Sequence, residues 1–140
     1  MAALAILVSA FAVARNSDSL ETLKKHLAAK RDQDRPPICL EIAEKQMEIA
    51  DKLYAEGKTE PATAALEDVA IYSEQARDAA VLTGKHLKDT EITARRLQMR
   101  LVDIKRTLSF EDQAPAEKAI SRLEQVRISL LKKMFPGGTR

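Results

Sequence analysis

The side chains best suited to metal binding or nucleophilic chemistry are few and dispersed: His26, His86 and Cys39. A zinc site needs about four converging ligands, and di-iron helical bundles use a Glu-x-x-His pattern. The positions three residues before the two histidines are Leu23 and Thr83, so that pattern is absent. The sequence therefore predicts no metal site, and both histidines are expected on the surface.

No other catalytic arrangement is recognisable. Cys39 has no base near it in sequence, and as a lone cysteine it is expected to be a buried small hydrophobic residue. A disulfide to another molecule is the alternative. Gly137-Gly138 follows an expected helix, whereas a phosphate-binding loop precedes one. Glu41 and Glu44 are spaced as neighbours on a helix surface. We expect a protein that is not an enzyme and that has no cofactor and no small-molecule ligand.

A basic cluster on the third quarter of the chain raises the question of nucleic acid. Asp89 and Asp103 interrupt its charge, and the stretch lacks the aromatic side chains on which single-stranded nucleic acids stack. Nucleic-acid binding is therefore not predicted. The cluster consists of Arg95, Arg96, Arg100, Lys105 and Arg106.

The composition indicates which elements must position these residues. Aromatic residues make up 4% of the 140 residues, there are 4 glycines and no tryptophan, and Ala, Leu, Glu, Lys and Arg dominate. This mixture is rich in helix formers and poor in the β-branched and aromatic runs of strands. The predicted fold class is all-α, with helical hairpins or a bundle.

Charge is distributed unevenly along the chain. Residues 37–75 hold nine acidic residues and three lysines, a net charge of −6, whereas residues 113–140 hold six basic and two acidic residues, a net charge of +4. The two regions are expected to face each other within one fold or across an antiparallel dimer. A basic tip for anionic lipid or nucleic acid is the functional alternative, and solvated faces are the third.

The N-terminal segment is typical of an export signal. Ala2 to Ala14 carries no charge, and the chain becomes polar at Arg15. Thirteen helical residues span about 20 Å, less than a bilayer core of about 30 Å. Ala12 and Ala14 form a small-x-small cleavage pattern, although no Lys or Arg precedes the apolar run. We expect residues 1–14 to be a signal peptide, 15–135 one helical domain and 136–140 a frayed tail. A retained membrane anchor and a core helix are the alternatives.

Apolar periodicity predicts helices that begin near Asp18 or Ser19, near Pro37 and near Pro115. Between the helices that begin near Pro37 and near Pro115, an apolar series runs from Ala62 to Leu108. It advances in steps of three and four residues without a phase slip. This series predicts one long central helix over about 60–108, about 70 Å long. A kink or break near Gly84 is the alternative, because glycine weakens a helix interior.

The middle of this apolar series consists of small residues, from Ser73 to Thr83. Small side chains let another helix approach closely, which is the interpretation we favour. The alternative is a loosely packed waist that admits a small ligand.

One passage resembles a tetratricopeptide-type helical hairpin. It covers residues 46–75, where Ala50, Tyr54, Gly57 and Ala62 stand at about that family's spacing. Gln46 replaces the expected bulky aromatic residue, and no second copy follows at the repeat length of 34 residues. The resemblance implies a helical hairpin rather than the peptide binding of tandem arrays. The whole chain is also similar to small exported all-helical bacterial proteins without an assigned activity.

Together these features predict a non-enzymatic exported protein, periplasmic or extracellular in a bacterium. It would act through a protein partner or self-association, with helix faces or a coiled-coil-like seam making the contact. The residues expected to form this face are Leu97, Leu101, Ile104 and Leu108, and a purely internal role in the core is equally compatible with them. Two alternatives stay open: a membrane-surface protein with Lys132 and Lys133 near anionic headgroups, and a ligand carrier or enzyme that uses the waist.

Overall fold

The computed structural model describes residues 19–137, and in this range the chain forms helices and no strands. Residues 19–29 are helical. Four longer helices follow: α2 (Arg35–Ala55), α3 (Thr59–Thr83), α4 (Leu87–Thr107) and α5 (Gln113–Met134). Short 3-10 turns, Asp32–Asp34 and Phe110–Asp112, precede α2 and α5. The predicted all-α fold class is confirmed.

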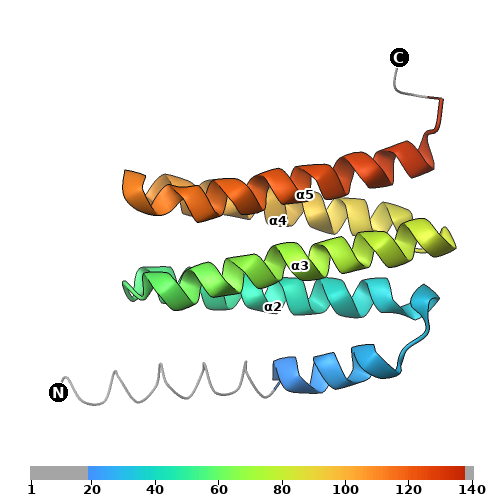
Figure 1. The fold of residues 1–140 in the computed structure, drawn as a ribbon, viewed down its shortest axis with the longest axis horizontal. Coiled ribbons are helices and arrows are strands. Elements are labelled where there is room, and N and C mark those ends of the chain that lie inside the picture. The colour runs from blue at the N-terminus through green and yellow to red at the C-terminus, as the bar shows by residue number, and fades with distance from the viewer. Residues whose placement is uncertain (1–18, 138–140) are drawn as a thin grey trace.

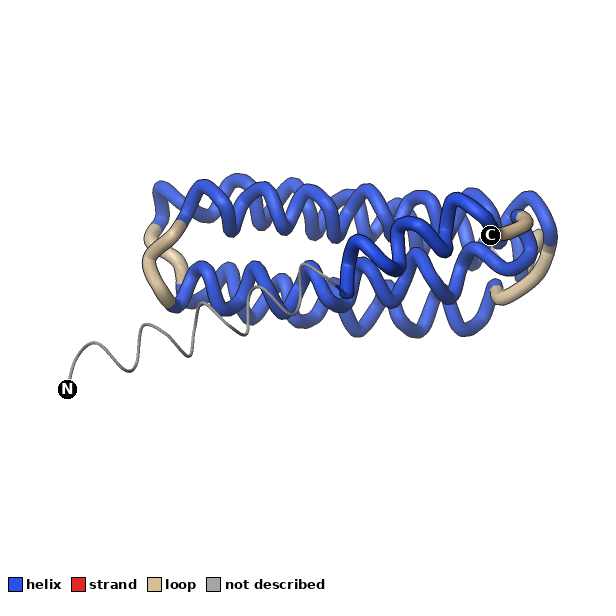
Figure 2. Tube along the Cα trace, turned by 90° about the horizontal axis from the view of Figure 1, so that it is seen from below, coloured by secondary structure: helices blue, strands red, loops and turns tan. Residues whose placement is uncertain are grey.

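The four long helices form an up-and-down bundle. The α2–α3 hairpin lies beside the α4–α5 hairpin, and α3 packs against α5 between them (Figure 1). The helix over residues 19–29 lies along the outer side of the α2–α3 hairpin (Figures 1 and 2). The bundle therefore carries an additional short helix on one of its two hairpins.

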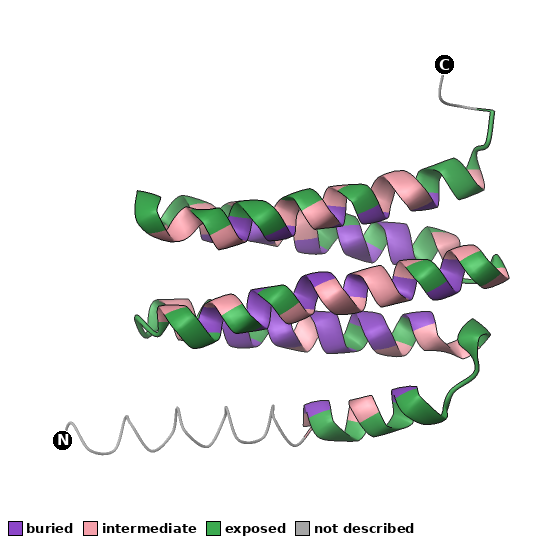
Figure 3. Ribbon diagram, viewed as in Figure 1, coloured by how far each residue is buried: buried purple, intermediate pink, exposed green. Residues whose placement is uncertain are grey.

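Each helix buries one stripe of apolar side chains, and the stripes meet along the bundle axis (Figure 3). One hydrophobic cluster takes residues from the helix over 19–29 and from all four long helices. Its fully buried members include Ile42, Met47, Leu101 and Leu123. A second cluster around Val126 and Leu130 fills the end of the bundle where α3 turns into α4. Burial of apolar area is the main stabilising contribution to such a fold.

The prediction of one long helix over 60–108 is wrong, and the break near Gly84 is found instead. Gly84 ends α3 in the left-handed region with φ +72°, and its N–H donates to Ala80 O over 2.8 Å. His86 is also left-handed, with φ +61°, and precedes α4. Two left-handed residues reverse the chain, so α4 folds back antiparallel to α3.

The phase of the apolar series did not reveal this turn. Thr83, the last residue of α3, and Leu87, the first of α4, are four positions apart, which equals one step of the helical stripe. The turn therefore preserves the three-and-four spacing although the helix stops.

The remaining boundaries lie within two residues of their predicted positions. Pro36 and Pro37 stand in the first turn of α2, and Gly57, with φ +76°, follows its end. The predicted signal peptide, its cleavage residues Ala12 and Ala14, and residues 138–140 of the predicted tail lie outside the described residues. Among the helices of residues 19–137, none has the length and apolar character needed to cross a bilayer.

Candidate interaction surface

The outer face of the α2–α3 hairpin is the surface on which the helix over residues 19–29 packs. Leu20 and Leu27 are buried against it, and Leu23 is half-buried. At the edge of the contact, Lys24 Nζ lies 5.9 Å from the centre of the Tyr72 ring on α3, within cation–π range. This face of the hairpin therefore accepts the apolar stripe of a helix.

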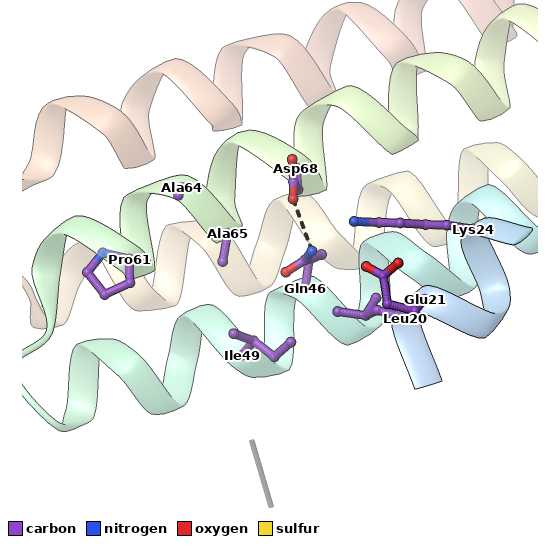
Figure 4. Close-up of a pocket in the computed structure, with 9 residues that line it drawn as sticks. All are labelled: Leu20, Glu21, Lys24, Gln46, Ile49, Pro61, Ala64, Ala65 and Asp68. Atoms are coloured by element: carbon purple, nitrogen blue, oxygen red, sulfur yellow. Dashed lines mark hydrogen bonds between the residues drawn. The ribbon is translucent and has the colours of Figure 1, made fainter. Parts of the chain in front are cut away.

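A groove continues this face beyond the position of Leu20 (Figure 4). It is a cavity of about 290 Å³ between α2 and α3 that is largely open to solvent. Ile49 on α2 and Pro61, Ala64 and Ala65 on α3 line its apolar part. The small side chains of the two alanines keep the cavity open, since each presents only a methyl group to it.

Polar groups occupy the end of the groove next to residues 19–29. Gln46 Nε2 donates to Asp68 Oδ2 over 3.0 Å, which links α2 to α3 (Figure 4). Glu21 and Lys24 complete this end of the lining. The groove therefore combines an apolar section with two carboxylates and one ammonium group, an arrangement suited to an amphipathic segment.

The predicted interaction face lies elsewhere, inside the bundle. Leu97, Leu101 and Ile104 are buried in the main hydrophobic cluster, and the half-buried Leu108 packs against it. Their contacts are with helices of the same chain. A partner could reach them only if the bundle opened.

The small-residue waist also lies in the core. Ser73, Ala76 and Ala80 are fully buried on α3. Ala76 belongs to the main cluster and Ala80 to the second one. The small side chains thus stand where α3 meets its neighbouring helices, as close packing requires.

The acidic region and the basic region face each other within one chain. Arg122 on α5 donates to Glu67 and Glu74 on α3, with Nη1–Oε1 2.7 Å and Nε–Oε2 3.0 Å. On the other side of the bundle, the guanidinium groups of α4 pair with α2: Arg96 with Glu44 at 3.4 Å and Arg100 with Asp51 at 3.7 Å. Among the described residues, the predicted pairing of residues 37–75 with residues 113–140 is confirmed at Arg122 alone. Arg96 and Arg100 lie outside the basic region and add contacts that were not predicted.

The basic cluster of α4 is neutralised in the same way. Besides Arg96 and Arg100, Lys105 pairs with Glu117 at 3.1 Å and Arg106 with Asp103 at 3.6 Å. Arg95 donates to Glu91. Every cation of the cluster therefore has a carboxylate partner within this chain.

Glu91 is a buried ionisable residue that sequence reasoning did not single out. Only 3% of it is exposed, on the face of α4 that meets α5. Burial alone would raise the pKa of this carboxyl group, but hydrogen bonds and charges from Arg95 and Arg127 lower it below its ordinary value. Arg127 Nη1 also donates to Gln98 over 2.9 Å. The result is a polar network that joins α4 to α5.

The residues considered first for chemistry are separated in space. Cys39 is buried, and burial raises the pKa of its thiol to about 11, with Arg35 opposing the shift. A thiol that stays protonated is a poor nucleophile. His26 is exposed on the helix over residues 19–29, and His86 is exposed in the turn between α3 and α4. Within residues 19–137, no three His, Cys, Asp or Glu side chains gather as metal ligands would.

The groove was missed for an identifiable reason. Its lining combines residues of three helices, and in the sequence Ala64 and Ala65 look like ordinary helix formers. The apolar stripe of Leu20, Leu23 and Leu27 was visible, but the surface that receives it was not.

No family model matches the chain, and no curated protein or solved structure shows significant similarity to it. The α2–α3 hairpin turns at Gly57, with Ala50 and Ala62 buried and Tyr54 Oη 3.4 Å from Thr63 Oγ1. Its resemblance to a tetratricopeptide-type hairpin stays a prediction.

Proposed function

We propose that this chain is a non-enzymatic exported protein that acts by binding another protein, with the groove between α2 and α3 receiving a helix of the partner. The observation that carries the proposal is the continuity of this groove with the surface already covered by residues 19–29. A face that receives three leucines of one helix supports the proposal that its uncovered continuation receives the apolar stripe of another.

The chemistry of the lining defines the expected partner. Ile49, Ala64 and Ala65 suit apolar anchors spaced three or four residues apart on a helix. Glu21 and Asp68 favour a basic residue beside that stripe, since they outnumber Lys24 in the lining. The partner segment is therefore expected to be an amphipathic helix with a basic flank.

We favour a different protein as the partner over a second copy of this chain. The electrostatic reason for an antiparallel dimer was the separation of an acidic and a basic region. Arg122 of the basic region pairs with Glu67 and Glu74 of the same chain, which weakens that reason.

Site-specific photocrosslinking in the native host tests the groove. A photoreactive residue replaces the exposed Glu21, which lines the groove, and Ala64→Arg in the same chain serves to fill it. We expect one discrete adduct of higher mass, and we expect Ala64→Arg to abolish it by placing a long charged side chain over the apolar lining. The same photoreactive residue at the exposed Ser121 of α5 is the control position.

Identification of the crosslinked peptide decides the outcome. A peptide with an apolar stripe and a basic flank supports the proposal. An adduct with residues of the same chain, an adduct with a second copy, or equal adducts from positions 21 and 121 contradicts it.

Export is tested separately by the intact mass and N-terminal sequence of the protein from fractionated host cells. A start at Arg15 in an envelope or extracellular fraction is expected if residues 1–14 are a signal peptide. Protein that retains Met1 in the membrane fraction would favour an anchor, and soluble cytoplasmic protein would contradict export.

A further inference from the structure

One end of the bundle is basic and the other is not. The basic tip is the end formed by residues 30–34, the α3–α4 turn, the end of α5 and the adjoining helical turns (Figure 1). It holds seven basic and three acidic residues, a net charge of +4. The basic residues are Lys30, Arg31, Arg35, Lys85, Lys88, Lys132 and Lys133, and the acidic ones are Asp32, Asp34 and Asp89.

The opposite end, defined in the same way, is neutral: four basic residues (Lys52, Lys58, Lys105, Arg106) stand against four acidic ones (Glu56, Glu60, Glu111, Asp112). The long helices are otherwise linked by ion pairs, as at Arg122 and Arg127. Lys85, Lys88, Lys132 and Lys133 pair with no acidic residue of the described chain, a state that they share with other lysines such as Lys52 and Lys118. What distinguishes these four is that they gather at one end of the bundle, where their combined charge can meet a counterpart outside the molecule.

The basic tip also exposes large apolar side chains. Leu82, in the last turn of α3, is 73% exposed, and Phe135, directly after α5, is 60% exposed. Leu131, one turn before the end of α5, is also exposed. Exposed apolar side chains surrounded by lysines are typical of surfaces that meet the headgroup layer of a bilayer.

We propose that the basic tip binds the surface of a membrane containing anionic lipids, with Lys85, Lys88, Lys132 and Lys133 at the headgroups and Leu82 and Phe135 inserted among them. This inference does not depend on the groove or its partner. Lysines provide attraction to anionic headgroups, and apolar side chains partition into the boundary between headgroups and acyl chains. A nucleic acid would use the lysines but would leave Leu82 exposed to water, so a bilayer fits this combination better.

Vesicle flotation with the full chain tests the proposal. Binding is compared on phosphatidylcholine vesicles with and without phosphatidylglycerol, for the wild type and for Lys132→Gln/Lys133→Gln. Each lysine near an anionic surface strengthens binding about fivefold, so we expect the pair to weaken partitioning roughly 25-fold. Leu82→Ser is expected to weaken it as well, and that loss should persist at high salt, because screening acts only on the charges.

A matched variant controls for total charge and for the N-terminal apolar segment. Lys52→Gln/Lys118→Gln removes two exposed lysines away from the basic tip and keeps everything else. We expect it to bind like the wild type, with all variants giving the same circular dichroism spectrum.

Three results would overturn the proposal. The first is an equal loss of vesicle binding in Lys132→Gln/Lys133→Gln and in the control Lys52→Gln/Lys118→Gln. The second is equal binding of the wild type to vesicles with and without phosphatidylglycerol. The third is binding to a duplex DNA oligonucleotide, sensitive to Lys132→Gln/Lys133→Gln, in a protein that does not float with vesicles.

Discussion

Glu91 shows how this bundle accommodates a charge in its interior. Its carboxylate accepts hydrogen bonds from Arg95 on the same helix and from Arg127 on α5, with the Arg127 Nε–Oε1 distance at 3.3 Å. An isolated buried carboxylate would be protonated, because desolvation disfavours the charged form. Two guanidinium groups reverse that preference, so the pKa of Glu91 lies below the ordinary value of 4.5.

Replacement of Glu91 by Gln is the prediction at this scale. It removes the charge and leaves Arg127 with a weaker partner, so we expect the free energy of unfolding to fall by about 2 kcal/mol near neutral pH. Because the pKa of Glu91 is lowered in the folded state, its stabilising contribution is present above pH 4.5 and is lost as pH falls through the lower folded value. Urea unfolding of both proteins across this range measures the effect.

The difference between the two proteins isolates Glu91 from the other carboxyl groups that titrate in acid. The difference in the free energy of unfolding between the wild type and Glu91→Gln should become smaller as the pH drops below 4.5. A difference that is independent of pH, or that widens in acid, would show that the carboxylate is not stabilised by its arginines.

Half of this network could be predicted from the sequence. Glu91 and Arg95 are four residues apart, the spacing of an ion pair on a helix. Arg127 is 36 residues further along the chain. Its arrival at Glu91 depends on the register between α4 and α5, which side-chain packing determines and which no local pattern contains.

At the scale of elements, the turn at Gly84 decides between a rod and a bundle. Its φ of +72° is a conformation that residues with a Cβ adopt at a cost, and beyond the two adjacent residues nothing lies within 4 Å of a Cβ placed there. We therefore expect Gly84→Ala to lower the free energy of unfolding by about 1 kcal/mol through backbone strain alone. Thermal and urea unfolding would measure it.

Gly137→Ala is the matched control, because Gly137 also has open space around it and lacks a positive φ. Its stability should equal that of the wild type. If Gly84→Ala were as stable as the wild type, the left-handed turn would not be the strained point, and the continuous helix over 60–108 would regain support.

The elements themselves were largely predictable from local signals. Prolines at 36, 37 and 115 and glycines at 57 and 84 stand at or within three residues of the helix ends. The long helix was predicted wrongly because periodicity reports which face is buried, and α3 and α4 bury faces that happen to continue in phase. Whether the chain reverses between them depends on two residues with positive φ, Gly84 and His86.

At the scale of the whole molecule, the apolar series from Ala62 to Leu108 correctly marked buried positions but not what covers them. Leu97, Leu101 and Ile104 pack against helices of the same chain instead of forming a free face. The groove, in turn, could not be predicted, because it exists only where residues 19–29, α2 and α3 come together. Sequence patterns identify buried faces, whereas the pairing of those faces is a property of the assembled bundle.

Leu101→Ala tests this placement against a role in partner binding. Leu101 is fully buried in the cluster shared by all the described helices, so truncation leaves a cavity at the centre of the bundle. We expect the free energy of unfolding to fall by about 2–5 kcal/mol. Met99→Ala, on the same helix but with Met99 64% exposed, should change stability by less than about 0.5 kcal/mol.

Urea unfolding followed by circular dichroism compares the two variants. Because the cluster joins every described helix, Leu101→Ala should shift the whole transition and not melt α4 alone. An interface residue would behave differently, since its truncation would leave the isolated protein stable and weaken only its contact with the partner. Unchanged stability in Leu101→Ala would therefore return Leu97, Leu101, Ile104 and Leu108 to consideration as a binding face and would contradict the packing described above.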